Sequence, residues 1–390
     1  MSVTGIIAEF NPLHNGHKAL LDAAKADGNT VVCAISGNFV QRGDTAVIPK
    51  YKRAEAALKC GADLVVELPV LWSMSTAQNF ALGGVSQLMN FGCDEIMFGS
   101  ECGDIDELQK AADILQSDNF SSVLSEELDK GVAFAAARET AAKKLGLSSP
   151  VLSTPNDTLG IEYILSARSL GFNGSFRTFK RIGAGHDSKE FNPLSVSASM
   201  IRERLKNGDL GFAERFMPME LRNFLSTSFI SDFSRLETAI LSTLRSKTKD
   251  DFTNLPDISE GLENKLFMSV QRATSFEELC SSVKTKRYSY ARIRRLVISA
   301  FLGLDNKFFR CIPPYVRILG FSNNGESICS GVGRVPVVTR AADIKKLDDD
   351  SISVFNTECK ATDIYSLSLF SPQECGAEYK TKLLKTECLK

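Results

Sequence analysis

Two of the three histidines in this chain stand three residues apart, in the tetrad His14-Asn15-Gly16-His17. The tetrad lies between an apolar run and a helical pattern, so we expect it to open a helix. The free N–H groups and partial positive charge at a helix N-terminus suit phosphate, and Gly16 lets the backbone approach a ligand closely. The imidazoles can then donate to an α-phosphate during nucleotidyl transfer and to the departing pyrophosphate. Two surface histidines, or a metal pair, are the alternative interpretations.

A second candidate segment, VSASMIRERL, spans residues 196–205. The hydroxyls of Ser197 and Ser199 at a predicted helix start can bind phosphate oxygens. Arg202 lies one turn further on and can neutralise pyrophosphate. An ordinary capped amphipathic helix is the alternative, but the segment resembles the (I)SSTxIR motif of nucleotidyltransferases that carry a His-x-Gly-His tetrad. The KMSKS motif of class I aminoacyl-tRNA synthetases is absent from the sequence.

Polar residues also follow the other predicted strands, where a solvated loop is the alternative for each of them. Arg42 is suited to phosphate or an RNA backbone, and Gly99 would allow close approach of a nucleotide. Asn156, in a turn before a helix, is suited to an adenine edge or a ribose, or to a helix cap. The segment FKRIGAGHD (179–187) joins Arg181 and His186 around small residues, which is typical of an anion cradle.

A basic segment, KTKRYSYARIRRLV, spans residues 284–297. Its tyrosines can stack on bases or sugars, and its cations can neutralise phosphates, so we expect it to bind RNA. The basic face of a structural helix is the alternative. The predicted RNA-binding residues are Arg42, Lys284, Lys286, Arg287, Arg292, Arg294 and Arg295.

The elements that must position these residues follow from hydrophobic periodicity. Apolar runs at 3–8, 30–35, 64–68 and 95–98 alternate with helical patterns at about 16–26, 50–60 and 76–91, which predicts a parallel sheet with crossover helices. We therefore expect a doubly wound α/β, Rossmann-like core with ligands at the carboxyl ends of its strands. Further helices are predicted over 104–117, 121–146 and 198–206, with another strand within 171–185.

Two domains are expected from the 390 residues. The nucleotide-binding core is placed at 1–210, and a mainly helical RNA-binding region at 211–390, with short strands near 315–340. The first 150 residues carry a net charge of −7 and the remainder +6. This asymmetry favours a polyanionic partner for the second half.

Composition excludes several classes of protein. Apolar residues make up 43% and charged residues 24%, which is typical of a globular protein. No stretch approaches the roughly 18 apolar residues that span a bilayer, and no signal peptide is evident, so we expect no membrane association and a cytoplasmic location. The ten cysteines form no CxxC pair, which predicts reduced thiols and no metal site.

The segments GIIAEFNPLHNGH, GNFVQRGDTAVIPKYKRAEAAL, GADLVVELP, PNDTLGIEY and KRIGAGHD together resemble the bacterial tRNA(Met) cytidine acetate ligases. The resemblance also includes FGSE, SASMIRERL and KRYSYARIRRLV, and it extends from residue 5 to about 297. It implies an enzyme that converts ATP and acetate to acetyl-AMP and pyrophosphate, and then acetylates N4 of the wobble cytidine of elongator tRNA(Met). Mg²⁺ is expected to accompany ATP.

The resemblance also implies site residues. The catalytic residues are His14, His17 and Arg202. The ATP contacts, with the two serines of the second segment included, are Ile7, Ala8, Glu9, Phe10, Asn11, Pro12, Leu13, His14, Asn15, Gly16, His17, Lys18, Ala19, Leu20, Gly99, Asn156, Arg181, Ser197 and Ser199.

The chain departs from the family pattern at three places. Leu13 replaces a common aromatic residue, Asp157 replaces an asparagine, and His186-Asp187 replaces Tyr-His. None of these removes a phosphate ligand. Two other functions fit part of the sequence: a small-molecule adenylyltransferase, which leaves the basic segment unexplained, and an RNA-binding protein with a regulatory nucleotide site. ATP turnover that requires acetate would separate the three hypotheses.

Overall fold

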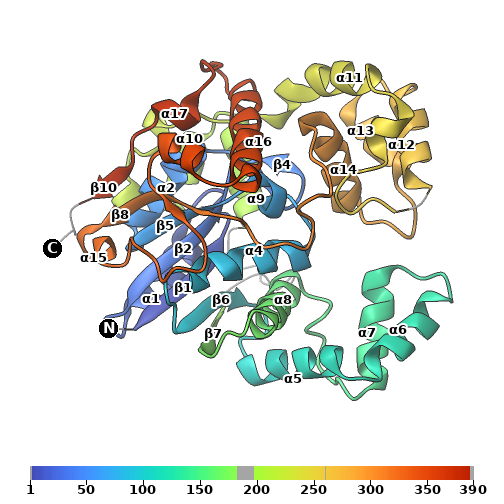
Figure 1. The fold of residues 1–390 in the computed structure, drawn as a ribbon, viewed down its shortest axis with the longest axis horizontal. Coiled ribbons are helices and arrows are strands. Elements are labelled where there is room, and N and C mark those ends of the chain that lie inside the picture. The colour runs from blue at the N-terminus through green and yellow to red at the C-terminus, as the bar shows by residue number, and fades with distance from the viewer. Residues whose placement is uncertain (1, 182–196, 260, 387–390) are drawn as a thin grey trace.

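The computed structural model of the chain describes residues 2–181, 197–259 and 261–386. Its centre is one mostly parallel sheet with helices on both faces (Figure 1), which confirms the predicted α/β fold. The strands of this sheet are β1 (Val3–Ala8), β2 (Thr30–Ser36), β5 (Leu64–Leu68), β6 (Glu95–Ser100), β7 (Ser175–Lys180), β8 (Val316–Ser322), β9 (Val337–Val338) and β10 (Leu384–Thr386). A separate hairpin joins β3 (Phe39–Val40) to β4 (Asp44–Thr45).

The strand order is β10-β8-β5-β2-β1-β6-β7, with β9 paired to β8. Within it, β5-β2-β1-β6-β7 is entirely parallel. The chain adds β2 and β5 on one side of β1 and then returns to add β6 and β7 on the other side, so the strand order reverses between β1 and β6. A doubly wound sheet binds its ligand outside the carboxyl ends of the strands at such a reversal. The fold therefore places a ligand site beyond Ala8 and Ser100.

Alternate side chains of the strands enter two separate cores, because successive residues of a strand point to opposite faces. Val31, Cys33 and Ile35 of β2 face one core, and Val32 and Ala34 face the other. The first core is covered by α1 (Asn15–Lys25), α2 (Lys50–Lys59), α9 (Ala198–Lys206) and α10 (Leu210–Glu214). The second is covered by α3 (Val70–Ser73), α4 (Ala77–Met89), α5 (Ile105–Gln116) and α8 (Pro155–Ser169).

The single helix predicted over 121–146 is wrong. The chain forms two helices, α6 (Phe120–Leu128) and α7 (Phe134–Lys144), which lie beside α5 in Figure 1. Gly131 separates them with a φ of +75°, a left-handed conformation that ends a right-handed helix and that glycine adopts without steric cost.

The second half of the chain is mainly helical, as predicted, but it also completes the sheet. Its helices are α11 (Glu237–Arg245), α12 (Leu262–Val270), α13 (Phe276–Val283), α14 (Tyr290–Leu302), α15 (Asn323–Glu326), α16 (Asp349–Ser366) and α17 (Ala377–Lys380). Figure 1 shows α11–α14 as a group at one side. The fully buried β8 pairs antiparallel with β5, so the sheet extends beyond the predicted boundary at residue 210. Hydrophobic pattern identifies such a strand but not the edge that it joins.

Candidate active site

A cavity of about 280 Å³ lies at the carboxyl ends of β1, β6 and β7. Its wall includes Ala8 and Glu9 after β1, Gly99 in β6, and Arg181 directly after β7. It coincides with the strand-order reversal, where the fold predicts a ligand. The N-terminus of α1 and the helix α8 supply further polar groups, as do Gln41, Arg42 and Ser197.

The histidine tetrad opens α1 because its own side chains cap the helix. His14 is the N-cap, with an extended φ of −136°, and its Nδ1 accepts a hydrogen bond from the Gly16 N–H at 3.0 Å. In return, the His14 N–H donates to Nδ1 of His17 at 3.3 Å. The rings stack with centroids 3.9 Å apart. Both imidazoles line the cavity, and their contact with phosphate stays a prediction.

Both histidines are neutral near pH 7. Burial, with smaller contributions from Arg181 and Arg202, lowers the pKa of His14 to about 4. Burial and the neighbouring His14 hold the pKa of His17 well below its usual range. Because each Nδ1 accepts a backbone hydrogen bond, the neutral ring carries its proton on Nε2. The neutral His14 ring therefore offers an N–H donor without requiring an imidazolium, whereas the His17 ring also has a hydrogen bond to the Pro12 backbone.

A reciprocal pair of carboxylates fixes the β6 end against the start of α8. Asp157 accepts from the Ser100 hydroxyl at 2.5 Å and from the Glu101 N–H at 2.8 Å. Glu101 accepts from the Asp157 N–H at 2.9 Å and from the Asn156 side-chain amide at 2.5 Å. With its Nδ2 engaged, Asn156 presents its amide oxygen as the acceptor for a ligand amine. Asp157 thus has a structural role at its family-divergent position.

Close packing sets the height of α8 above the sheet. A Cβ on Gly160 would lie 2.3 Å from the ring of Phe98, so only glycine permits this approach. Asn156, Leu159 and Tyr163 then face the cavity from one side of the helix, as the i, i+3, i+7 spacing requires.

Arg202 is not part of the cavity wall; it contacts the loop between β1 and α1. It is on α9, and its Nη1 donates to the carbonyl oxygen of Asn11 at 2.8 Å. Ser197 caps α9, as predicted, and lines the cavity. Ser199 is exposed, with its hydroxyl 2.8 Å from that of Ser197. Direct contact of Arg202 and Ser199 with a nucleotide stays a prediction.

The predicted ATP contacts divide into two groups. Those in the cavity wall are Ile7, Ala8, Glu9, His14, Gly16, His17, Ala19, Leu20, Gly99, Asn156, Arg181 and Ser197. Those outside it are Phe10, Asn11, Pro12, Leu13, Asn15, Lys18 and Ser199. The side chains of Phe10 and Leu13 pack into a core, and Lys18 pairs with Asp22 and Glu220. His186 and the preceding Gly183, Ala184 and Gly185 lie outside the described residues.

The basic segment is split between two environments. Lys284, Lys286, Arg287 and the distant Arg42 are exposed. The other three arginines, on α14, are turned inward. Arg292 donates to the Asp257 carbonyl at 2.7 Å, Arg294 to that of Gly43 at 2.9 Å, and Arg295 to that of Gln41 at 3.3 Å. These bonds attach α14 to the β3–β4 hairpin and to the loop around residue 257. The contacts of these three arginines therefore fit the alternative of a structural helix, and RNA binding by them stays a prediction.

Sequence reasoning missed several residues of the cavity. Gln41, Phe80, Phe98, Pro155, Leu159, Tyr163 and Phe179 also line it. Helical spacing from Asn156 would have identified Leu159 and Tyr163, whereas no local signal singles out Phe80 on α4. Arg53 was also missed as a support: its buried guanidinium donates to the carbonyl of Glu9 at 2.6 Å and to that of Gly37.

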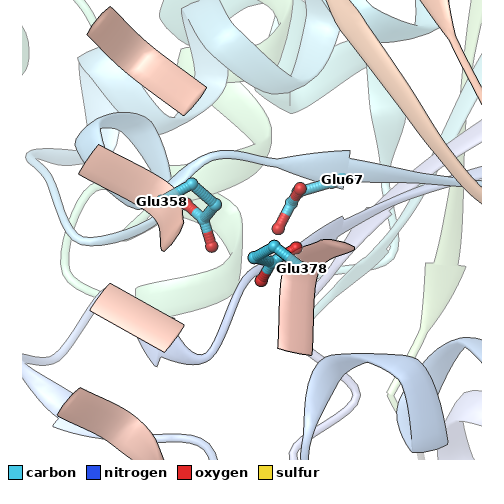
Figure 2. A group of neighbouring side chains, drawn as sticks. All are labelled: Glu67, Glu358 and Glu378. Carbon is cyan, nitrogen blue, oxygen red and sulfur yellow. The ribbon is translucent and has the colours of Figure 1, made fainter. Parts of the chain in front are cut away.

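A different acidic cluster resembles a metal site but is filled by a lysine. Glu67, Glu358 and Glu378 point toward one another (Figure 2), and all three are fully buried. The ammonium of Lys50 lies 2.6 Å from Glu378, 3.0 Å from Glu358, and also against Glu67. The guanidinium of Arg317 pairs with Glu378 and lies 3.8 Å from Glu67, so two cations face the three carboxyl groups. Burial and the neighbouring Glu358 raise the pKa of Glu67 to about 8, which keeps it largely protonated near pH 7. The cluster joins α2 and β5 to α16 and α17.

None of the helices in the described part of the chain has the length and apolar content needed to cross a membrane.

Comparisons with known proteins agree with this geometry. The HIGH Nucleotidyl Transferase family model matches residues 1–380. The tRNA(Met) cytidine acetate ligase of Thermoanaerobacter sp. (strain X514) is 35% identical over 99% of this chain and 100% of its own length. That of Caldanaerobacter subterraneus is 37% identical over 94% and 96%.

Two crystal structures of Thermotoga maritima TmcAL are also similar, and each match covers 99% of this chain and 100% of the other. The apo form has a TM-score of 0.90 at 32% identity, and the form bound with alpha-thio ATP has 0.88 at 31%. With its sheet, cavity and full-length relatives in agreement, this chain belongs to the HIGH nucleotidyltransferases and, among them, to the tRNA(Met) cytidine acetate ligase family.

Proposed function

We propose that the chain activates acetate with ATP, releases pyrophosphate, and transfers the acetyl group from acetyl-AMP to N4 of the wobble cytidine of elongator tRNA(Met). The observation that carries the first step is the neutral pair His14 and His17 at the N-terminus of α1, inside the switch-point cavity. A tRNA substrate implies a cytoplasmic enzyme.

In the first step, an acetate oxygen attacks the α-phosphorus of ATP opposite the leaving pyrophosphate. Mg²⁺, when bound to the nucleotide, would neutralise part of the phosphate charge. Negative charge then grows on the phosphoryl oxygens, and preorganised donors are most effective where charge develops. The Nε2–H of His14 supplies such a donor, and His17 supplies a second when its ring exchanges the Pro12 contact for a phosphoryl oxygen. The positive end of the α1 dipole favours the same charge, although the Asn15 and Gly16 N–H groups are themselves bonded within the chain. Arg181, in the same wall, adds a full positive charge.

The nucleoside is expected on the side of Gly99 and Asn156. Gly99 leaves room for a flat ring, and the Asn156 amide oxygen can accept from the exocyclic amine of adenine. Phe80, Phe98 and Tyr163 form an apolar wall, all three at most 3% exposed. Such a wall limits the water that would hydrolyse a mixed anhydride.

The tRNA is expected on the exposed cations Arg42, Lys284, Lys286 and Arg287. Arg42 is also in the cavity wall, so the phosphate-binding surface and the reaction site share a residue. The wobble base must leave its stack to reach the anhydride. Salt should weaken binding strongly, since released counterions contribute to the affinity.

The test supplies ATP, Mg²⁺, labelled acetate and unmodified elongator tRNA(Met), and detects N4-acetylcytidine by mass spectrometry after digestion. Product should require ATP and acetate and should form without acetyl-CoA. Acetate-dependent ATP–pyrophosphate exchange measures the first step alone. His17→Ala should reduce that exchange by 100-fold or more, roughly the effect of losing one such donor.

Asp22→Asn is the matched control, because Asp22 lies on the same helix, pairs with Lys18 and is outside the cavity wall. It should leave exchange near the wild-type rate. Absence of both product and exchange in the wild-type chain would refute the proposed function. Exchange without product would move the acceptor to another molecule.

A further inference from the structure

Glu9 is the one carboxylate in the described wall of the cavity. It directly follows β1, the middle strand of the parallel part of the sheet, and it is half-buried. Its Oε1 accepts a hydrogen bond from the Gln41 N–H at 2.9 Å, while Oε2 has no hydrogen-bond partner among the described residues. One oxygen is thus fixed by the protein and the other is free to accept from a ligand.

An ionised carboxylate cannot bind a phosphate directly. Both groups are anionic and both only accept hydrogen bonds, so their approach is repulsive. Within a cavity for a nucleotide and a second substrate, the natural partner of a carboxylate is therefore an N–H donor. Two exocyclic amines are available in the proposed reaction: N6 of adenine and N4 of cytidine.

The surroundings of Glu9 favour the cytidine. Its partner Gln41 lines the cavity together with the exposed Arg42. The Gln41 carbonyl in turn accepts from Arg295 on α14, whose preceding segment carries the exposed Lys284, Lys286 and Arg287. A single residue thus connects Glu9 to the element expected to carry RNA. The adenine amine has its own acceptor in Asn156, which is held by Glu101.

On the basis of the function proposed above, we propose that Glu9 binds the exocyclic amine of the acceptor cytidine and acts as the general base for acetyl transfer. The cytidine N4 attacks the carbonyl carbon of acetyl-AMP, forming the C–N bond. The bond from that carbon to the phosphate oxygen breaks, and AMP leaves with the electron pair. The proton lost from N4 goes to Oε2 of Glu9. A carboxylate that accepts from cytidine N4 is an established mode of base recognition.

The experiment separates the two half-reactions in Glu9→Gln. Glutamine retains an oxygen acceptor for the Gln41 N–H, so the β3–β4 loop should keep its position. The substitution removes only the carboxylate that acts as the base. We expect acetate-dependent ATP–pyrophosphate exchange within about threefold of wild type. Single-turnover transfer from enzyme-bound acetyl-AMP to the tRNA should fall about 100-fold or more, the usual contribution of a general base.

A pH profile of the transfer step adds a readout that a structural role would not change. The Glu9→Gln rate should rise more steeply with pH between about 6.5 and 9 than the wild-type rate, because solvent hydroxide replaces the missing carboxylate. Asp44→Asn is the matched control, because it removes a carboxylate from the β3–β4 hairpin that carries Gln41, and Asp44 lies outside the cavity wall. It should preserve both half-reactions.

The other outcomes overturn the proposal in distinct ways. Loss of exchange in parallel with transfer would place Glu9 at ATP or its Mg²⁺, and a raised KM for ATP alone would place it at adenine. Unchanged transfer would exclude a role for Glu9 while leaving the proposed function intact. Failure of the wild-type chain to acetylate the tRNA would instead refute the proposed function, and the role of Glu9 with it.

Discussion

Lowering the pH from 7.5 to 5.0 should destabilise the core of this protein through His14. In the unfolded chain the pKa of His14 is about 6.5, whereas burial lowers it to about 4 in the folded state. Between these values the unfolded state binds a proton that the folded state does not. The free energy of unfolding is therefore unaffected at high pH and decreases as the pH falls below about 6.5.

The magnitude follows from the two pKa values. At pH 5.0 the unfolded form is favoured by RT times the logarithm of the ratio of the two proton-binding polynomials, which is about 2 kcal/mol. At pH 7.5 the same expression is close to zero. The loss attributable to His14 over this interval is thus about 2 kcal/mol, a substantial share of the 5–15 kcal/mol typical of a folded protein.

The assay is urea unfolding followed by fluorescence of Trp72, the single tryptophan, which is fully buried in α3 beside the sheet. His14→Asn is the comparison, because asparagine is a good N-cap that does not titrate. The wild-type chain should lose about 2 kcal/mol more than this variant between the two pH values. Equal losses would show that His14 titrates normally and would refute its neutral, buried state.

Two further substitutions test long-range contacts by the same unfolding assay. Lys50→Met should destabilise by about 3 kcal/mol or more, because it leaves the buried Glu358 without its cation and leaves Glu378 with Arg317 alone. Lys52→Met, on the partly exposed side of the same helix, should cost less than about 1 kcal/mol. Equal effects of the two substitutions would contradict the importance of the cluster. Asp157→Asn should lower the free energy of unfolding by about 1–3 kcal/mol, because an amide N–H would face the donors of Ser100 and Glu101 that now bond to the carboxylate. An unchanged urea midpoint would contradict that account.

Local pattern determined most of the nucleotide-binding core. The bounds predicted for β1 and β5 coincide with those observed, because a buried parallel strand is a short continuous apolar run between turn residues. The N-cap of α9 at Ser197 was also predicted correctly, because an N-cap depends on the residues next to it in the sequence. The place of His14 and His17 at the start of a helix was also predicted from the sequence, while their catalytic role stays a prediction.

Tertiary structure alone decided which of these residues meet. Phe80 reaches the cavity wall from α4, an element that contributes no other residue to it. Arg294 and Arg295 contact the β3–β4 hairpin, which lies more than 200 residues away in the chain. A guanidinium has the same sequence signature whether it binds RNA or a carbonyl within the chain. Only packing shows which partner it has.

The same limit applies to the sheet edge and to Glu9. The pattern of β8 indicates a buried strand, but its antiparallel pairing with β5 joins residues as distant in the chain as Leu64 and Phe321, which no local pattern specifies. Glu9 is one residue of a matched segment in the sequence. In the structure it is the one carboxylate among the described residues of the cavity wall, and it accepts a hydrogen bond from a backbone N–H 32 residues further along the chain. The two meet because parallel strands bring distant loops to one edge of the sheet.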